Sequence, residues 1–172
     1  MQAGNETGGW LPAVEALAGA MERGDGLAAL AAIDSLAGAQ LAHALFTVNR
    51  FDAPAMRVVR LYSSNPAAYP AGGSKDKRGT EWGRHVLLER RVFVGEGADA
   101  IRQAFDDHAA IAALGLRSVI NVPVVLRQAC LGTVNFLMRS EHVSAEQLGA
   151  ARLAALHAVP AFGLLGLAPA AI

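Results

Sequence analysis

The hydrophobic and polar positions of this chain change their spacing several times, and each change predicts a different secondary-structure element. Alanine and leucine dominate residues 11–22 and 27–46, which predicts two helices on either side of a Gly-Asp-Gly break. After Gly38 the residues become β-branched and aromatic, so the second helical stretch is expected to give way to a strand at about 41–49.

Two hairpins are predicted where strands follow one another closely. Residues 56–64 alternate between apolar and polar side chains, and a turn at Asp52–Pro54 joins them to the preceding strand. Residues 118–125 and 130–138 are rich in β-branched side chains and are separated only by a tight turn. Proline cannot donate a hydrogen bond to a sheet, so Pro123 predicts an edge or a bulge. Further elements are a helix at 80–90, a short strand at 92–94, helices at 98–105 and 108–115, and a final helix capped by Ser144.

This order of elements predicts an α+β fold with a single antiparallel sheet. The length of 172 residues suits one domain. Within it we expect an N-terminal helical extension at 1–24, the main domain at 25–160, and an apolar tail at 161–172 that packs on the domain.

A long polar loop, Ser63–His85, interrupts this mostly apolar chain. Its Asn-Pro, Tyr-Pro and Gly-Gly pairs are strong turn signals, so no regular element is expected before Thr80. Tyr69 and Trp82 lie near its two ends and can supply flat apolar walls with a polar tip. The loop is therefore interpreted as a lid over a pocket.

Two passages of the sequence resemble the GAF domain family. They are Leu116–Val124, which ends in Val-Pro-Val, and Leu131–Phe136, which begins with Leu-Gly-Thr; Arg91–Gly95 is similar to a short strand of the family. The resemblance spans about residues 25–160. It implies a central antiparallel sheet with terminal helices on one face, and loops and short helices forming a ligand pocket on the other. It also implies that the Ser63–His85 loop covers the ligand, since GAF domains bind small molecules or act as dimerising sensory modules.

The charge balance argues against a nucleic-acid partner. The chain carries 15 Lys and Arg against 15 Asp and Glu, so its formal net charge is zero, whereas nucleic-acid binders carry a clustered basic excess. The densest basic run, Lys75–Arg78, includes an aspartate and is interpreted as a solvated loop. The apolar C-terminal stretch is short and interrupted by prolines, so it is not expected to cross a membrane. A soluble, cytoplasmic protein is expected.

The sequence shows no arrangement suited to metal or cysteine redox chemistry. No two of the five histidines have metal-ligand spacing, and the single cysteine, Cys130, cannot complete a cysteine-based site. In GAF domains, bilin attachment uses a cysteine that is usually followed by histidine, but here Leu131 follows. Methionine sulfoxide reduction needs a pair of cysteines, and the cyclic-nucleotide pattern lies late in the domain, whereas Asn49–Asp52 is early. We expect no metal and no cofactor.

Several side chains are candidates for contact with a ligand. Trp82 and His85 are three residues apart on a predicted helix, so they share a face that either lines the pocket or packs into the core. His108 follows two aspartates and either brings an imidazole to the pocket rim or lies in solvent at a helix end. The predicted ligand-binding residues are Tyr69, Trp82, His85, Phe93, Phe105, His108, Asn121 and Asn135.

Asn121 and Asn135 each interrupt an apolar strand. A buried amide needs hydrogen-bond partners, which are either a ligand or another part of the protein. A two-residue turn at Arg127–Gln128 places the two amides on opposite faces of the sheet, whereas a longer turn or a one-residue bulge places them on the same face. The sequence leaves both arrangements open.

The resemblance, with no evident nucleophile, favours a stand-alone sensory or regulatory module that binds a small molecule and signals to a separate chain. One alternative is an enzyme that uses His85 or His108 as general acid or base, and another is a dimerisation scaffold without a ligand. The terminal helices offer more apolar surface than one sheet face can bury, which predicts a homodimer.

Overall fold

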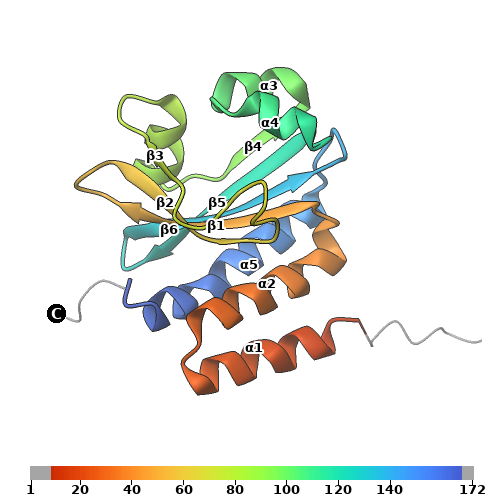
Figure 1. Cartoon of the computed structure of the whole chain (residues 1–172), viewed down its shortest axis with the longest axis vertical. Helices are drawn as coiled ribbons and strands as arrows, with labels where there is room; N and C mark the ends of the chain where they lie inside the picture. The colour runs from red at the N-terminus through yellow and green to blue at the C-terminus, as the bar shows by residue number, and fades with distance from the viewer. Residues whose placement is uncertain (1–8, 168–172) are drawn as a thin grey trace, which may run out of the picture.

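The computed structural model describes residues 9–167 and contains a six-stranded sheet with long helices on one face and short helices and loops on the other (Figure 1). This arrangement confirms the predicted α+β fold. In chain order the elements are α1 (Leu11–Arg23), α2 (Gly26–Leu41), β1 (Leu45–Asp52), β2 (Arg57–Ser63), β3 (Ser74–Asp76), the π-helical turn η2 (Gly83–Leu88), β4 (Phe93–Glu96), α3 (Gly97–Ala104), α4 (His108–Ala113), β5 (Ser118–Leu126), β6 (Ala129–Met138) and α5 (Ala145–Leu164).

The strands lie in the order β3-β2-β1-β6-β5-β4, and every neighbouring pair is antiparallel. Both predicted hairpins, β1–β2 and β5–β6, are confirmed. The two hairpins join where β1 pairs with β6, although these strands are far apart in the chain. The centre of the sheet is therefore a long-range contact.

Two of the predicted boundaries are wrong. The strand expected from about residue 41 begins at Leu45, because α2 continues to Leu41 and ends at Ala42 in the left-handed conformation, with φ 49°. The Ser63–His85 loop, expected to hold no regular element before Thr80, contains β3, which pairs with β2. Backbone pairing at the edge of an existing sheet needs no β-branched side chains, so the polar Ser-Lys-Asp segment carried no strand signal.

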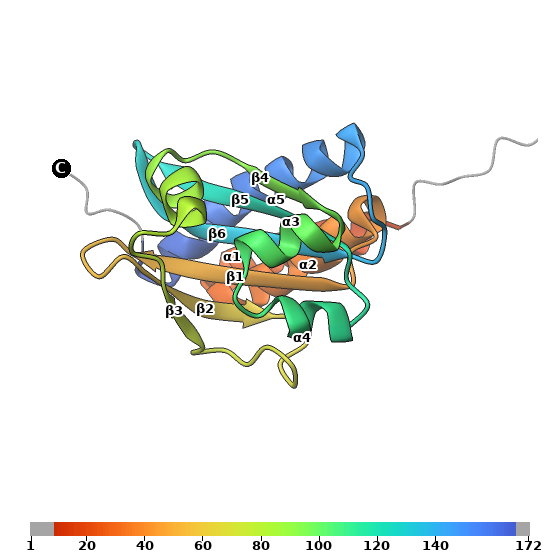
Figure 2. The same ribbon diagram turned by 90° about the horizontal axis from the view of Figure 1, so that it is seen from above.

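α2 and α5 cover one face of the sheet, and α1 packs on α2 outside them (Figure 1). Seen from above, both inner helices run beneath the strands (Figure 2). Alternate strand residues such as Phe46, Ile120 and Phe136 point into this layer and have no exposed surface. The buried side of α5 consists mainly of small residues, which lets the helix approach the sheet closely: Ala150, Ala151, Ala154, Ala155, Ala158 and Ala161.

α5 continues through Pro160 to Leu164, so the tail predicted from residue 161 begins inside a helix. A proline inside a helix removes one backbone hydrogen bond. The residues packed around it are buried in the main core, and this packing holds the helix together across the proline. Residues 1–8 and 168–172 of the predicted extension and tail lie outside the described part of the chain, and the domain boundaries stay predictions.

A partly buried polar cluster connects α2 to the sheet. The Tyr62 hydroxyl donates a hydrogen bond of 3.1 Å to Asp34 Oδ2, and His43 Nε2 lies 2.6 Å from Asp34 Oδ1. The His43 ring also packs edge-on against Phe136, with 5.2 Å between ring centroids. Burial, followed by the charge of Asp34, raises the pKa of Tyr62 to about 12, so this hydroxyl remains a donor at neutral pH. The cluster joins α2, the segment after it, and β2.

A bulge in β6 decides how the two asparagines face. The turn contains two residues, Arg127 and Gln128, and Leu126 pairs with Ala129. Val125 then pairs with Cys130 but Val124 pairs with Gly132, so β6 carries one extra residue at this point. From there Asn121 lies directly opposite Asn135, on the same face of the sheet.

Pro123 lies where one side of β5 is an open edge. The pairing of β4 with β5 runs from Ser118 to Asn121 and goes no further along β5. Pro123 itself pairs with Thr133 of β6, next to the bulge. The expected edge and bulge are therefore both present near this proline.

Replacing Gly132 by alanine is expected to open the centre of the sheet. A Cβ atom at this position would lie 1.9 Å from the backbone oxygen of Asn49, and an atom inserted against a packed backbone forces the strands apart. Gly132→Ala should lower the free energy of unfolding by about 3 kcal/mol or more, measured by chemical denaturation. Gly149→Ala is the control, because its Cβ meets nothing within 4 Å and should add about 0.5–1 kcal/mol. Equal stability of Gly132→Ala and the unchanged protein would contradict this close approach of β1 and β6.

Candidate ligand pocket

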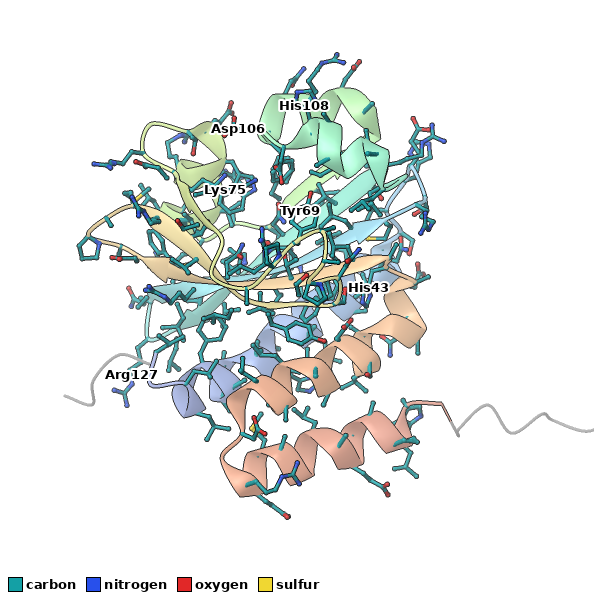
Figure 3. All side chains as sticks on the ribbon, viewed as in Figure 1. His43, Tyr69, Lys75, Asp106, His108 and Arg127 are labelled. Atoms are coloured by element: carbon teal, nitrogen blue, oxygen red, sulfur yellow. The ribbon has the colours of Figure 1, made fainter. Side chains whose placement is uncertain are left out.

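A cavity of about 70 Å³ lies on the sheet face opposite α2 and α5. The strands form its floor, and the Ser63–His85 loop and the segment before α4 form its cover. Tyr69 and Lys75 of the cover reach into the space above the sheet (Figure 3). Its lining residues are Leu45, Thr47, Asn49, Val58, Arg60, Tyr69, Gly73, Lys75, Lys77, Trp82, Phe105, Asp107, Ile111, Val119, Asn121, Asn135 and Leu137.

The floor follows from the alternation of side chains along each strand. Thr47 of β1, Asn121 of β5 and Asn135 of β6 face the cavity, while their neighbours Phe46 and Ile120 face the helices. The two sheet faces therefore carry different chemistry, because the helix side is mostly apolar and the cavity side is partly polar.

A chain of hydrogen bonds crosses the floor. Trp82 Nε1 donates to Asn121 Oδ1 at 2.9 Å, and Asn121 Nδ2 donates to Asn135 Oδ1 at 2.8 Å. Asn135 Nδ2 then donates to the carbonyl and the hydroxyl oxygen of Thr47, both at 3.2 Å. Both amides thus bond to other parts of the protein, and they also border the cavity. Their contact with a ligand stays a prediction.

Three cations and one carboxylate line the cavity. Lys75 Nζ and Asp107 Oδ1 form an ion pair at 2.5 Å. Burial alone would raise the pKa of Asp107, but Lys75 and, to a smaller extent, the Asp107 backbone amide and the Tyr69 hydroxyl outweigh burial, and the pKa lies below its usual value. Lys77 is only 6% exposed, and its ammonium group lies over the Trp82 ring, 4.8 Å from the centroid. Burial, then the charge of Lys75, lowers the pKa of Lys77.

Arg60 and Tyr69 form another part of the wall. The guanidinium carbon of Arg60 lies 4.9 Å from the Tyr69 ring centroid, and Arg60 Nη1 donates to the Pro70 carbonyl at 3.0 Å. Arg60 Nε and the Tyr69 hydroxyl are buried and have no hydrogen-bond partner among residues 9–167. Burial, followed by the nearby Asp107 carboxylate, raises the pKa of Tyr69 to about 12, so its hydroxyl keeps its proton.

The structure brings together five of the predicted ligand-binding residues around this cavity: Tyr69, Trp82, Phe105, Asn121 and Asn135. The other three border different depressions. His85 and Phe93 line one of about 530 Å³, which also touches Trp82, and His108 lines one of about 440 Å³ beside α3 and α4. His85 Nε2 donates to the Val92 carbonyl at 3.0 Å, which fixes its ring outside the cavity.

The polar wall contains residues that the sequence analysis did not select, namely Arg60, Lys75, Lys77 and Asp107. The interpretation of Lys75–Arg78 as a solvated loop is wrong for Lys77, which is buried. Lys75 and Lys77 are two residues apart next to an edge strand, so both turn inward while Asp76 and Arg78 stay exposed. The alternation of the run was the signal that could have revealed them.

Cys130 packs beside the Trp82 cluster and is partly buried. Burial raises the pKa of its thiol to about 11, so it is a poor nucleophile at neutral pH. Across residues 9–167, no three His, Cys, Asp or Glu side chains gather in a way that could hold a metal ion. In the same part of the chain, no helix combines the length and apolar character needed to cross a membrane.

Known GAF structures share this fold. No protein-family profile and no curated protein matches the sequence. The GAF domain of a phosphoenolpyruvate-protein phosphotransferase from Coxiella burnetii superposes with a TM-score of 0.69 and 12% identity, over 92% of this chain and 95% of that one. The phycoerythrobilin-bound GAF domain of a cyanobacterial phytochrome gives 0.66 and 12%, over 92% and 96%. Residues 122 to 287 of a methyl-accepting chemotaxis protein give 0.67 and 18%, over 88% and 97%. The predicted GAF fold is confirmed.

The amide chain predicts strong coupling between its two asparagines. Asn135→Leu leaves the buried Asn121 amide without its acceptor, which should lower the free energy of unfolding by about 1–3 kcal/mol. The double variant Asn121→Leu/Asn135→Leu should cost less than the sum of the two single variants, because it leaves no amide facing a leucine. Chemical denaturation of the four proteins measures this cycle. Additivity within about 0.5 kcal/mol would contradict a direct bond between the two side chains.

Proposed function

We propose that this protein is a regulatory module whose small-molecule ligand occupies the cavity between the sheet and the Ser63–His85 loop. The observation that carries the proposal is the convergence on a cavity of two buried donors, Arg60 Nε and the Tyr69 hydroxyl, that make no hydrogen bond among residues 9–167, since native proteins rarely leave such groups unpaired. The GAF fold supports it, because similar structures include parts of a phytochrome and of a chemotaxis protein.

The cavity joins segments that would respond together to a ligand. Tyr69, Lys75 and Lys77 come from the covering loop, and Arg60 comes from β2 in the sheet. A molecule that contacts both would order the loop on the sheet, and binding would favour one arrangement of the domain over others. The helical layer lies on the opposite face of the same sheet (Figure 1). We propose that it passes this change to a separate protein.

The geometry gives less support to an enzyme. His85 and His108, the two candidates for a general acid or base, border depressions other than the central cavity. The Nε2 proton of His85 is also used by the Val92 carbonyl. A ligand in the cavity would meet lysine, arginine, tyrosine and amide groups, which suit binding.

A variant that fills the cavity should abolish ligand binding and keep the fold. Val119 is buried and lines the cavity, whereas Val125 lies further along the same strand and is 37% exposed. A screen of small metabolites by thermal unfolding should find compounds that raise the Tm of the unchanged protein. Val119→Phe should lose this response, and Val125→Phe should retain it, with circular dichroism as the check on folding.

The same screen separates the ligand-binding module from an empty scaffold. Mass spectrometry of the denatured protein would add any molecule carried through purification. If no compound raises the Tm and no molecule is released, the proposal of a ligand-binding module is wrong.

The predicted homodimer would use the helical layer. Several apolar side chains of α2 and α5 are exposed there, including Leu27 at 51%, Leu153 at 47% and Leu156 at 67%. Leu153 also borders a groove of about 280 Å³ between α1, α2 and α5. Light scattering coupled to size-exclusion chromatography should give about twice the chain mass of 17.9 kDa. A mass of one chain at micromolar concentration would contradict the dimer.

A further inference from the structure

The central cavity holds more positive than negative charge. Of the three cations that line it, only Lys75 has a carboxylate within ion-pair distance among residues 9–167. Lys77 is more than nine-tenths buried, at 6% exposure, and borders the cavity beside Trp82. An unpaired buried cation is unfavourable, and stacking on an aromatic ring offsets only part of this cost. The surroundings of Lys77 therefore suit an anion.

The two unused donors at the same cavity are those that an oxyanion requires. Arg60 Nε and the Tyr69 hydroxyl are buried and make no hydrogen bond among the described residues, although the hydroxyl lies close to the Asp107 carboxylate. Both residues line the cavity with Lys77. Ammonium and guanidinium groups form their strongest hydrogen bonds with carboxylate and phosphate oxygens. Asp107 is the acidic residue of the lining, and its charge is already balanced by Lys75.

The apolar part of the cavity lining and the cavity volume restrict the size and polarity of the non-ionic part of the ligand. Leu45, Val119 and Leu137 give the cavity an apolar side. The volume of about 70 Å³ corresponds to roughly five to seven water-sized groups, at about 10–15 Å³ each. This space suits a short carbon skeleton. It is too small for a nucleotide or a bilin.

We propose that the cavity binds a small organic carboxylate that carries one or two negative charges. Its carboxylate accepts hydrogen bonds from Lys77 Nζ and Arg60 Nε, and the Tyr69 hydroxyl donates a third bond to the ligand. Its carbon skeleton packs against the apolar side of the cavity. This inference rests on the proposed regulatory function and names the chemical class of its ligand.

The test compares carboxylates with their neutral amides on the full-length protein. Acetate, propionate, malonate and succinate are the probes, with acetamide, propionamide, malonamide and succinamide as matched controls at constant ionic strength and pH. Thermal unfolding and titration calorimetry report binding. At least one carboxylate should raise the Tm and bind, and its amide should do neither. Inorganic phosphate is a separate arm, since it offers oxyanion chemistry without a carbon skeleton.

Two variants test the residues that carry the inference. Lys77→Met keeps the long apolar stem without the charge, and Arg60→Gln removes the guanidinium; each should weaken carboxylate binding by roughly 30-fold or more. Arg57→Gln on the same strand is the control, because Arg57 is exposed and lies outside the cavity lining. Lys77→Met should also raise the Tm of the ligand-free protein, because it removes an unpaired buried charge.

The outcomes separate this inference from the proposed function. Equal binding of amides, binding of phosphate alone, or full carboxylate affinity in both variants would overturn the carboxylate assignment. A neutral compound that binds the unchanged protein but not Val119→Phe would also overturn it, while the ligand-binding function would stand. If none of the carboxylates binds, the assignment is wrong; if the metabolite screen is also empty, the proposed function is wrong as well.

Discussion

The hydrogen bond between Asn121 and Asn135 links β5 and β6, and the arrangement of the pocket depends on it. Each amide is almost completely buried, so each must find partners within the protein. Through Trp82 the pair connects to the helical turn that follows the covering loop, and through Thr47 it connects to β1. A polar chain thus runs from the cover across β5, β6 and β1, three of the strands that line the cavity. Because its members are shielded from water, a break in any bond leaves an unpaired group.

The two faces of the sheet differ in polarity: one packs against the helices in the apolar core, and the other borders the cavity. On the helix side, Phe46 and Phe136 stack with 4.8 Å between ring centroids and pack with alanines of α5 in the main apolar core. On the other side, the cavity brings together polar and charged groups that a core would exclude. The apolar side stabilises the domain, and this allows the polar side to hold a buried lysine and unpaired donors that lower stability.

The GAF fold is retained here with little sequence identity to known structures. At 12% to 18% identity the superpositions still cover most of the chain. The features that keep such a fold are patterns of side chains, such as alternation along the strands and a helix face made of small residues. Many sequences satisfy these patterns. This likeness shows the fold alone, so the ligand has to be argued from this cavity itself.

Local interactions made much of the architecture predictable. Both hairpins follow from runs of β-branched residues joined by short turns. The start of α5 follows from Ser144, which forms a capping box with Gln147 at the predicted place. Tyr69 and Trp82 were recognisable because large aromatic residues in a polar loop need a surface to pack on. These features depend on neighbours within a few residues, and the sequence carries that information directly.

The composition of the pocket was decided by contacts between distant segments. The bulge in β6 sets the faces of Asn121 and Asn135, and it lies where Gly132 allows β1 to approach closely. The sequence predicts Lys77 to be a solvated loop residue. In the structure, β3 pairs with the edge of the sheet, and the Lys77 side chain is buried. Trp82 meets Asn121, 39 positions away in the chain, only because the loop folds back over the floor. Local patterns in the sequence were enough to predict most helices, both hairpins and the aromatic residues of the cover. Which polar groups share the cavity depends on the assembled sheet and its cover, because burial and pairing arise only when these distant segments come together.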